Sequence, residues 1–254
     1  MASFLQKLFG GMAPAGVPAS LQELVVDMHS HLLPGIDDGA ATIEHSVELL
    51  REMQALGYRK LVMTPHVMGD FFRNTPATIR AALAQLQTAA AAAGITDVAL
   101  ECAAEYYLDE WFGRKLETGE ELLTFGGDRH YLLFETSYIN EPFNLAETVF
   151  NLRAAGYQPV LAHPERYTYL YGRFEELERI RESGVLLQVN LNSLAGYYSS
   201  GAQRVAEKLI DAGLVDMLGT DAHNVKHTTT LRNKVLSASY LRKALELPLL
   251  NNTL

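Results

Sequence analysis

The feature that most restricts the fold of this chain is a regular alternation of short apolar segments with longer amphipathic ones. From Glu23 onwards, runs rich in β-branched and apolar residues precede stretches in which apolar residues recur three and four positions apart. These are the periods of buried strands and of helices. Strand and helix in repeated alternation predict a parallel sheet covered by helices. The predicted strands are 24–28, 61–64, 98–103, 131–134, 159–162, 186–189 and 216–219, and the predicted helices are 42–56, 76–93, 145–155, 174–183, 202–212 and 229–246.

The number of these units favours a barrel. Seven strand–helix units within roughly 230 residues fit a closed or nearly closed (β/α) barrel better than an open five-stranded sheet. We therefore expect one α/β domain over residues 23–254, preceded by a flexible leader over residues 1–22. Several predicted helices end in a glycine, the residue that most easily adopts the left-handed conformation at a helix end. These glycines are Gly57, Gly94, Gly156, Gly184 and Gly213.

Composition excludes several classes of protein. The formal net charge of −9 disfavours binding to nucleic acid. Cys102 is the only cysteine, so no intramolecular disulfide and no cysteine-based zinc cluster can form. A cysteine-dependent phosphatase would need an arginine six positions later, where this chain has Leu108. No segment has the 18 or so apolar residues of a transmembrane helix, and the N-terminus lacks a signal-peptide core, so we expect a cytoplasmic protein.

Histidines, carboxylates and amides gather where the predicted strands end. The C-terminal ends of parallel barrel strands converge on one face, where active sites are built. A lone histidine is more often structural than functional, but strand periodicity places His29 and His31 on one face. The residues at or just after the strand ends are Asp27, His29, His31, His66, Glu105, Glu135, His163, Glu165, Arg166, Asn190, Asn192, Asp221 and His223, with Asp38 on the loop after the first strand.

This concentration of carboxylates predicts bound metal. Four carboxylates buried together without counter-charge would cost many kcal/mol, and Arg166 is the only arginine at these strand ends. Divalent cations are the simplest source of the missing charge. Mixed imidazole and carboxylate ligands suit Mn, Fe or Zn, and the lack of thiolates argues against a structural zinc site. Among the other histidines, His45 fits a solvated helix face. His130 precedes a strand and is therefore expected at the N-terminal end of the barrel, opposite the predicted site. His227 lies just beyond the last loop.

Seven motifs, in order along the chain, carry a resemblance to a known family. They are DMHSHLLPGIDDGA at 27–40, TPH at 64–66, AAEYYL at 103–108, FE at 134–135, AHPERY at 162–167, QVNLNSLAGYY at 188–198 and GTDAH at 219–223. On these motifs the chain resembles the bacterial PHP-family protein tyrosine phosphatases of capsule and exopolysaccharide loci, from about residue 25 to about residue 245.

The resemblance implies a distorted TIM-like (β/α)7 barrel with a trinuclear metal centre, usually of manganese. It implies three sets of metal ligands. It also implies three catalytic residues, which are Arg166, in contact with the phosphate, and the ligands His163 and His223. The first set is His29, His31, Glu105 and Asp221, the second is Glu105, Glu135 and His163, and the third is Asp38, His66 and His223. Family members carry a further arginine after the last Asp-x-His. Here that region offers Lys226, His227 and, later, Arg232, so the second phosphate contact stays open.

The expected activity is hydrolysis of phosphotyrosine by a metal-activated hydroxide, without a covalent phosphoenzyme. By resemblance, the partner would be a tyrosine autokinase of polysaccharide export. Asp27, Asp37 and Glu165 are expected to orient imidazoles or the arginine, and Tyr197 and Tyr198 to line the mouth.

Other functions stay open. The chain could be a PHP phosphatase for a small metabolite such as histidinol phosphate, or a non-catalytic phosphotyrosine-binding partner of a kinase. An amidohydrolase is less favoured, because Glu135 stands where those barrels commonly carry a carbamylated lysine. A nuclease is disfavoured by the net charge of −9. The sequence leaves the oligomeric state open.

Overall fold

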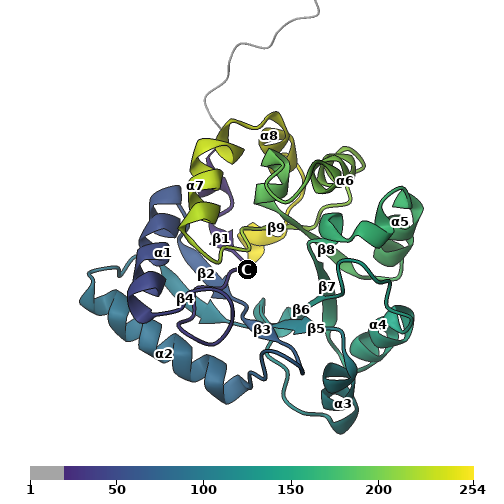
Figure 1. The fold of residues 1–254 in the computed structure, drawn as a ribbon, viewed down its shortest axis with the longest axis horizontal. Coiled ribbons are helices and arrows are strands. Elements are labelled where there is room, and N and C mark those ends of the chain that lie inside the picture. The colour runs from purple at the N-terminus through teal and green to yellow at the C-terminus, as the bar shows by residue number, and fades with distance from the viewer. Residues whose placement is uncertain (1–19) are drawn as a thin grey trace, which may run out of the picture.

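The strands pair in parallel, as predicted, and form two sheets in a computed structural model that describes residues 20–254 (Figure 1). One sheet has the order β1 (Val26–Asp27), β2 (Lys60–Met63) and β4 (Ala99–Cys102). The other has the order β3 (His66–Val67), β5 (Glu105–Tyr107), β6 (Tyr131–Glu135), β7 (Gln158–Ala162), β8 (Leu186–Asn190) and β9 (Met217–Gly219). The chain is therefore an α/β fold with parallel sheets.

Strands β3 and β5 were not expected. His66 and Glu105 do not simply follow the second and third predicted strands. Each begins a further short strand, and the two residues are register partners in the second sheet. Pro65 lacks the N–H that a continuous strand would donate at that point, although its carbonyl still accepts the N–H of Glu105 at 3.0 Å. The break moves the chain from one sheet to the other and brings two proposed ligands side by side.

Most helices begin and end within two residues of their predicted bounds. These are α1 (Ile43–Leu56), α2 (Pro76–Ala92), α4 (Leu145–Ala154), α5 (Phe174–Glu182) and α6 (Ser200–Asp211). The five glycines predicted to end helices all have positive φ angles, from 67° at Gly213 to 105° at Gly57. Helix α3 (Glu110–Thr118) was missed, although Asp109 caps it by accepting the Phe112 N–H at 2.8 Å.

The prediction of one helix over 229–246 is wrong. The chain forms α7 (Val225–Asn233), a 3₁₀ turn (Val235–Ser237) and α8 (Ser239–Leu245). Val235 is fully buried, and the Ser237 hydroxyl donates to the Lys234 carbonyl at 2.9 Å. Burial of Val235 and this local hydrogen bond stabilise the turn in place of a further helical turn.

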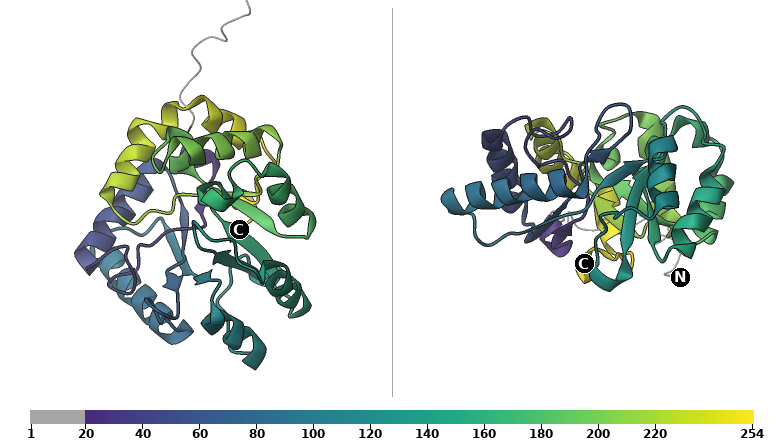
Figure 2. Two further views of the ribbon diagram at one scale, coloured as in Figure 1. Left: turned by 45° about the vertical axis from the view of Figure 1, so that its right-hand side comes forward. Right: turned by 90° about the horizontal axis from the view of Figure 1, so that it is seen from below.

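The helices lie around the outside of the strands (Figures 1 and 2). On the inner side, β1 and β9 meet beyond their ends through a parallel bridge between Ser30 and Ala222. Thr220 adds to this contact, because its N–H and hydroxyl donate to Asp27 at 2.9 and 2.8 Å. The arrangement brings the first and last strands, and with them His29, His31 and Asp221, into one place.

The folded domain includes residues before the expected boundary at residue 23. Ser20 caps a 3₁₀ turn (Leu21–Glu23), and Leu21 is fully buried in the core. The rest of the predicted leader, residues 1–19, lies outside the residues that the structure describes. Over residues 20–254, no helix is long and apolar enough to cross a membrane.

Candidate metal centre

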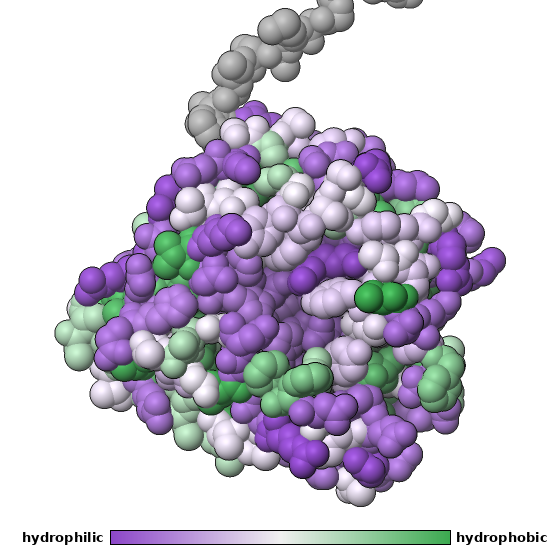
Figure 3. Space-filling view, viewed as in Figure 1, coloured by the Kyte–Doolittle hydropathy of each residue, from purple (hydrophilic) through white to green (hydrophobic). Residues whose placement is uncertain are grey.

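All nine predicted metal ligands come together at the C-terminal side of the strands. Each belongs to at least one group of three or four residues whose ligand atoms lie within 4.8 Å of one another. Figure 3 shows hydrophilic side chains gathered in a hollow at the centre of this face. The four groups are His31, Asp38, His66 and His223; His29, Glu105 and His163; His29, His31 and Asp221; and His66, Glu105 and Glu135.

Glu105 lies at the deepest point of this centre and is fully buried. Its Oε2 is 3.1 Å from His66 Nδ1, 3.3 Å from His29 Nε2 and 3.4 Å from His31 Nε2, yet it receives no hydrogen bond. Its other oxygen, Oε1, is 3.0 Å from His163 Nε2. The buried nitrogens His66 Nδ1 and His163 Nδ1 also have no hydrogen-bond partner. Buried polar atoms without a hydrogen-bond partner indicate a missing ligand. Because these atoms belong to imidazoles and a carboxylate, the residues fit divalent cations.

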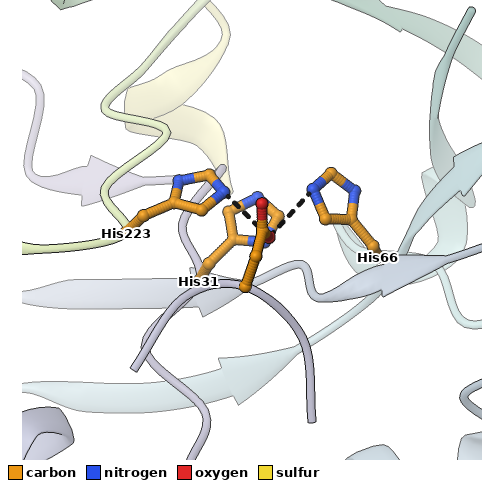
Figure 4. A group of neighbouring side chains, drawn as sticks. His31, His66 and His223 are labelled. Atoms are coloured by element: carbon orange, nitrogen blue, oxygen red, sulfur yellow. Dashed lines mark ion pairs between the residues drawn. The ribbon is translucent and has the colours of Figure 1, made fainter. Parts of the chain in front are cut away.

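A second group lies nearer the surface. The Nε2 atoms of His66 and His223 are each 3.4 Å from Asp38 Oδ1, the contacts that Figure 4 draws as dashed lines. His31 stacks on His223 with a centroid separation of 4.0 Å. The Asp38 side chain is 57% exposed, so this group faces the solvent whereas Glu105 does not.

The spatial groups differ in part from the sets that the resemblance implies. Glu135 Oε1 is 3.1 Å from His66 Nδ1, whereas its Oε2 is 4.0 Å from His163 Nε2. Glu135 therefore groups with His66 and Glu105, and His163 groups with Glu105 and His29. Glu105 belongs to both groups, as expected of a ligand shared between ions.

The electrostatics of the centre depend on opposite charges held close together. Burial alone would raise the pKa of Glu105, but His29 and His66 hold it well below its usual value. Burial alone would lower the pKa of His66, but Glu105 raises it well above its usual value. The pKa values of His29 and His31 are also raised, so protons on these three imidazoles would balance the carboxylates. Metal ions would displace those protons, as is usual for histidine ligands.

The backbone is strained at two of the nine residues. His163 has a φ of 33° and Asp221 a φ of 50°, a region that non-glycine residues rarely occupy. Strain of this kind costs about 1–3 kcal/mol per residue and gathers at functional sites. Both residues follow the end of a strand, and both side chains belong to the ligand groups of the centre.

Further polar side chains orient the histidines. The His31 Nδ1–H donates to Asp37 at 2.7 Å, as predicted. The His29 Nδ1–H donates to Gln188 at 2.8 Å, which we did not predict. Gln188 and Asn190 lie two apart on β8 and share a hydrogen bond of 2.8 Å, so period-two alternation could have identified this face. Such partners fix the tautomer of a metal-binding imidazole.

Two residues expected to orient imidazoles or the arginine have other hydrogen-bond partners. Asp27 accepts from Thr220, and Glu165 accepts from Asn190 and Ser193. Among residues 20–254, neither makes a hydrogen bond to an imidazole or to Arg166. Both carboxyls are fully buried, and burial raises the pKa of Asp27 to about 6 and also raises the pKa of Glu165.

Arg166 lies at the edge of the centre. Its Nη1 donates to Asp221 Oδ2 at 2.8 Å, and its guanidinium lies 4.5 Å from the ring of Tyr138 and 4.1 Å from the ring of Tyr198. Although burial opposes the charge, Asp221 and the two tyrosines raise the pKa of Arg166. Tyr198 lies in the site as predicted, and Tyr138 is a residue that sequence reasoning missed.

The three candidates for a second phosphate contact differ in position, and two of them lie further out than Arg166. Arg232 forms an ion pair with Glu52 of α1, on the outside of the molecule. Lys226 is exposed, with its ammonium 5.6 Å from the ring of Tyr197. His227 is buried and accepts the His223 N–H on its Nδ1 at 3.1 Å, and burial lowers its pKa to about 4.

The other two histidines lie away from the centre, as predicted. His45 is on α1, and His130 is an exposed residue immediately before β6, at the N-terminal ends of the strands.

Comparison with known proteins identifies the family. Residues 25–245 match the family described as "Capsular polysaccharide synthesis, CpsB/CapC". The chain belongs to the CpsB/CapC family. Tyrosine-protein phosphatase YwqE of Bacillus subtilis (strain 168) is 29% identical over 202 residues, which cover 80% of this chain and 78% of YwqE. Tyrosine-protein phosphatase CpsB of Streptococcus pneumoniae is 27% identical over 206 residues, which cover 79% of this chain and 84% of CpsB.

Solved structures agree with the assignment to CpsB/CapC. The structure reported for YwqE and CpsB as "unique metal-dependent tyrosine phosphatases" matches with a TM-score of 0.76 at 29% identity, covering 87% of this chain and 89% of the other. An amidohydrolase from Mycoplasma synoviae matches with a TM-score of 0.55 at 12% identity, covering 92% of this chain and 88% of the other. The second match bears on the fold alone.

Proposed function

We propose that this chain is a metal-dependent protein-tyrosine phosphatase of the CpsB/CapC family. The observation that carries the proposal is the largely buried cluster of nine imidazole and carboxylate ligands beside Arg166. The relatives named tyrosine-protein phosphatases support it. The metal cluster and the arginine together suit a phosphate dianion, because both supply positive charge at one place.

The ligands divide among three divalent ions, and manganese is the proposed metal, with iron or zinc as alternatives. Imidazole and carboxylate ligands without thiolates suit these metals. Glu105 would be shared between ions, and Asp38, His66 and His223 would hold the ion nearest the solvent. When bound, the ions would lower the pKa of water towards neutrality and offset the charge of the phosphate oxygens.

Arg166 binds the phosphate in this proposal. Its planar guanidinium can donate two parallel hydrogen bonds to a phosphate, which a lysine cannot do. Nη1 already donates to Asp221, and the two tyrosine rings restrict the rest of the group. The remaining donors are therefore available to a substrate in a fixed direction. A group ordered before binding loses less entropy when the substrate arrives.

The leaving group favours aryl phosphates. A tyrosine leaves as a phenolate whose conjugate acid has a pKa of about 10, so it needs less help from a general acid than a serine alkoxide does. The proposed substrate is a phosphotyrosine protein of polysaccharide synthesis, a tyrosine autokinase being the candidate, and the proposed compartment is the cytoplasm. No role in nucleic acid binding is proposed.

The proposed architecture is one domain that forms a distorted seven-stranded barrel. In this interpretation β2 and β3 count as one interrupted strand, and β4 and β5 as another. The bridge between Ser30 and Ala222 supports closure between the first and last strands. Because Leu21 is buried in the core, the proposed domain begins before residue 23, and the proposed leader is the segment before Ser20.

A substrate panel tests the function. The purified protein is stripped with EDTA, reloaded with Mn²⁺, and assayed for phosphate release from a phosphotyrosine peptide, a phosphoserine peptide and histidinol phosphate. We expect Mn²⁺-dependent hydrolysis of the phosphotyrosine peptide above the other two, and none after EDTA. Full activity in metal-free protein would refute the proposal, and preference for histidinol phosphate would support the small-metabolite alternative. Tight phosphopeptide binding without phosphate release would support a binding role.

A further inference from the structure

Tyr138 is a partly exposed aromatic residue inside the candidate site. It lies on the loop after β6, its side chain is 37% exposed, and its ring covers the guanidinium of Arg166 at 4.5 Å. The same ring is 5.8 Å from the ring of His163. Tyr138 therefore lies between the proposed phosphate-binding arginine and a proposed metal ligand, with part of its ring facing the solvent.

The backbone of Tyr138 is held firmly although its ring is exposed. Its carbonyl accepts two hydrogen bonds from Thr168, from the N–H at 2.7 Å and from the hydroxyl at 2.8 Å. Nearby, the Thr136 N–H donates to the Tyr167 hydroxyl at 3.1 Å, and the Thr136 and Tyr169 hydroxyls are 2.8 Å apart. These bonds fix the loop to the segment that follows Arg166. A rigid aromatic surface that stays exposed is typical of a binding wall, because little entropy is lost when a ligand packs on it.

The other tyrosines of the mouth do not offer such a surface. The ring of Tyr198 packs on Arg166, and its hydroxyl lies within hydrogen-bond distance of Asp221 and Asn190. Tyr197 packs edge-on against His227 at 4.9 Å and lies under Lys226. Beside Tyr138, in contrast, the next residue, Ile139, is 73% exposed. Of these three tyrosines, Tyr138 is the one followed by an exposed apolar residue.

We propose that Tyr138 selects aryl phosphates over alkyl phosphates. In this view its ring contacts the guanidinium of Arg166 on one side, and its exposed part packs against the aromatic ring of the substrate. The identity of that substrate rests on the proposed phosphatase function, but the preference for an aryl group does not require turnover. Tyr138 is thus a specificity-determining residue, and its contact with the aryl ring is distinct from the binding of the phosphate by Arg166.

Two phosphonates separate these roles, because they share a head group and differ in the aryl ring. Binding of phenylphosphonate and of methylphosphonate to the Mn²⁺-loaded protein is measured by calorimetry for the wild type, Tyr138→Leu and Tyr138→Phe. We expect the wild type to prefer phenylphosphonate. Tyr138→Leu should weaken phenylphosphonate binding about three- to tenfold, the usual worth of an aromatic pair, and change methylphosphonate binding less than about twofold. Tyr138→Phe keeps the ring and loses only the long contact of the hydroxyl with Glu135 at 3.5 Å, so it should keep the preference for phenylphosphonate. The matched control is Tyr240→Leu, a tyrosine on α8 whose hydroxyl donates to Asp211 at 3.1 Å, and it should leave the preference unchanged.

Several outcomes would overturn the proposal. These are a wild type without preference for phenylphosphonate, an equal loss for both ligands in Tyr138→Leu, or the same loss in Tyr240→Leu. The wild-type measurement decides even if Tyr138→Leu does not fold. Failure of the phosphatase proposal looks different: a protein that prefers phenylphosphonate through Tyr138 but releases no phosphate from any aryl phosphate would refute the proposed function and leave this inference standing.

Discussion

Two buried polar clusters lie at opposite ends of the strands, and they differ in whether their members satisfy one another. At the N-terminal ends, Asn251 is fully buried near the C-terminus of the chain, which lies low in the right-hand view of Figure 2. Its Oδ1 accepts the Leu218 N–H at 3.0 Å, and its Nδ2 donates to the carbonyls of Val26 and Leu218 at 3.1 and 2.8 Å. Every polar atom of this side chain has a partner.

At the C-terminal ends the cluster around Glu105 is not complete. Glu105 Oε2, His66 Nδ1 and His163 Nδ1 are buried without hydrogen bonds, and two residues there, His163 and Asp221, hold strained backbone angles. The difference separates a structural cluster from a functional one. Polar groups that satisfy one another stabilise the fold, whereas groups that converge without doing so require an external ligand.

The largest expected effect comes from Glu105, the residue at the centre of the incomplete cluster. Glu105→Gln keeps the shape of the side chain but removes the charge that His29, His31 and His66 face. We expect kcat/KM for a phosphotyrosine peptide to fall at least about a thousandfold. We also expect the rise in Tm on adding Mn²⁺ to shrink, because a ligand that binds only the folded state stabilises it.

The matched control is Glu101→Gln on β4. Glu101 is exposed and forms an ion pair with Lys60 at 2.7 Å. The activity of the Glu101→Gln variant should therefore stay within about twofold of the wild type. A Glu105→Gln protein that keeps its metal content and its activity would remove the distinction between the two clusters.

Arg166 gives the next largest effect, and it separates phosphate binding from metal binding. Arg166→Ala removes the guanidinium but leaves Asn190 and Tyr198 beside Asp221. Turnover should fall at least about a hundredfold, while the metal content measured by mass spectrometry stays the same. Arg166→Lys should recover only part of the loss, because the planar fork is missing. The control is Arg173→Ala, which removes a half-buried arginine that pairs with Glu141 outside the metal cluster. If Arg166→Ala turned over substrate as fast as the wild type, the proposal that Arg166 binds the phosphate would be wrong.

Asn251 tests the completed cluster. Asn251→Ala leaves the backbone groups of Val26 and Leu218 without their partner. The free energy of unfolding, measured with urea, should drop by about 2–3 kcal/mol. Because the site lies at the other end of the strands, kcat/KM below the melting range should stay within about twofold. Asn252→Ala, which loses one hydrogen bond to the Glu23 carbonyl at the surface, should cost less than about 0.5 kcal/mol. A large loss of activity in folded Asn251→Ala would show that the two ends are coupled.

The sequence predicted the incomplete cluster far better than the completed one, for a physical reason. Residues such as His29, His31 and Asp221 stand at strand ends, and strand direction alone brings such positions together. Asn251, in contrast, is one of two adjacent asparagines after α8. It bonds to backbone atoms of Val26 and Leu218. Because nearly every residue has the same backbone groups, such bonds cannot be predicted from the residue types in the sequence.

The same limit explains what was missed within the site. Tyr138 was not singled out, because its position depends on the two hydrogen bonds that Thr168 donates to its carbonyl. Strands β3 and β5 were missed because two or three residues carry too little periodicity to identify a strand. Strand ends and helix caps can thus be predicted from residue types, whereas loop positions fixed by backbone contacts cannot.

The smallest expected effect concerns His227, a polar residue at the boundary of the metal cluster that does find its partner. Its Nδ1 accepts the His223 N–H, and burial lowers its pKa from 6.5 to about 4. Above the unfolded value, the ring is neutral in both states and the protein keeps its full stability. As the pH falls from about 6.5 towards 4, the unfolded chain binds a proton that the folded protein does not, so stability is lost.

From pH 7 to pH 5.5 this group alone should lower the free energy of unfolding by about 1 kcal/mol. His227→Gln can still accept the His223 N–H but cannot titrate, so it should lose about 1 kcal/mol less than the wild type over that interval. Urea unfolding at both pH values, in EDTA so that metal release does not contribute, measures the difference. Parallel losses in the two proteins would mean that the folded protein binds the proton as readily as the unfolded chain. His227 would then belong with the charged imidazoles of the cluster, and not with the groups whose hydrogen bonds keep them neutral.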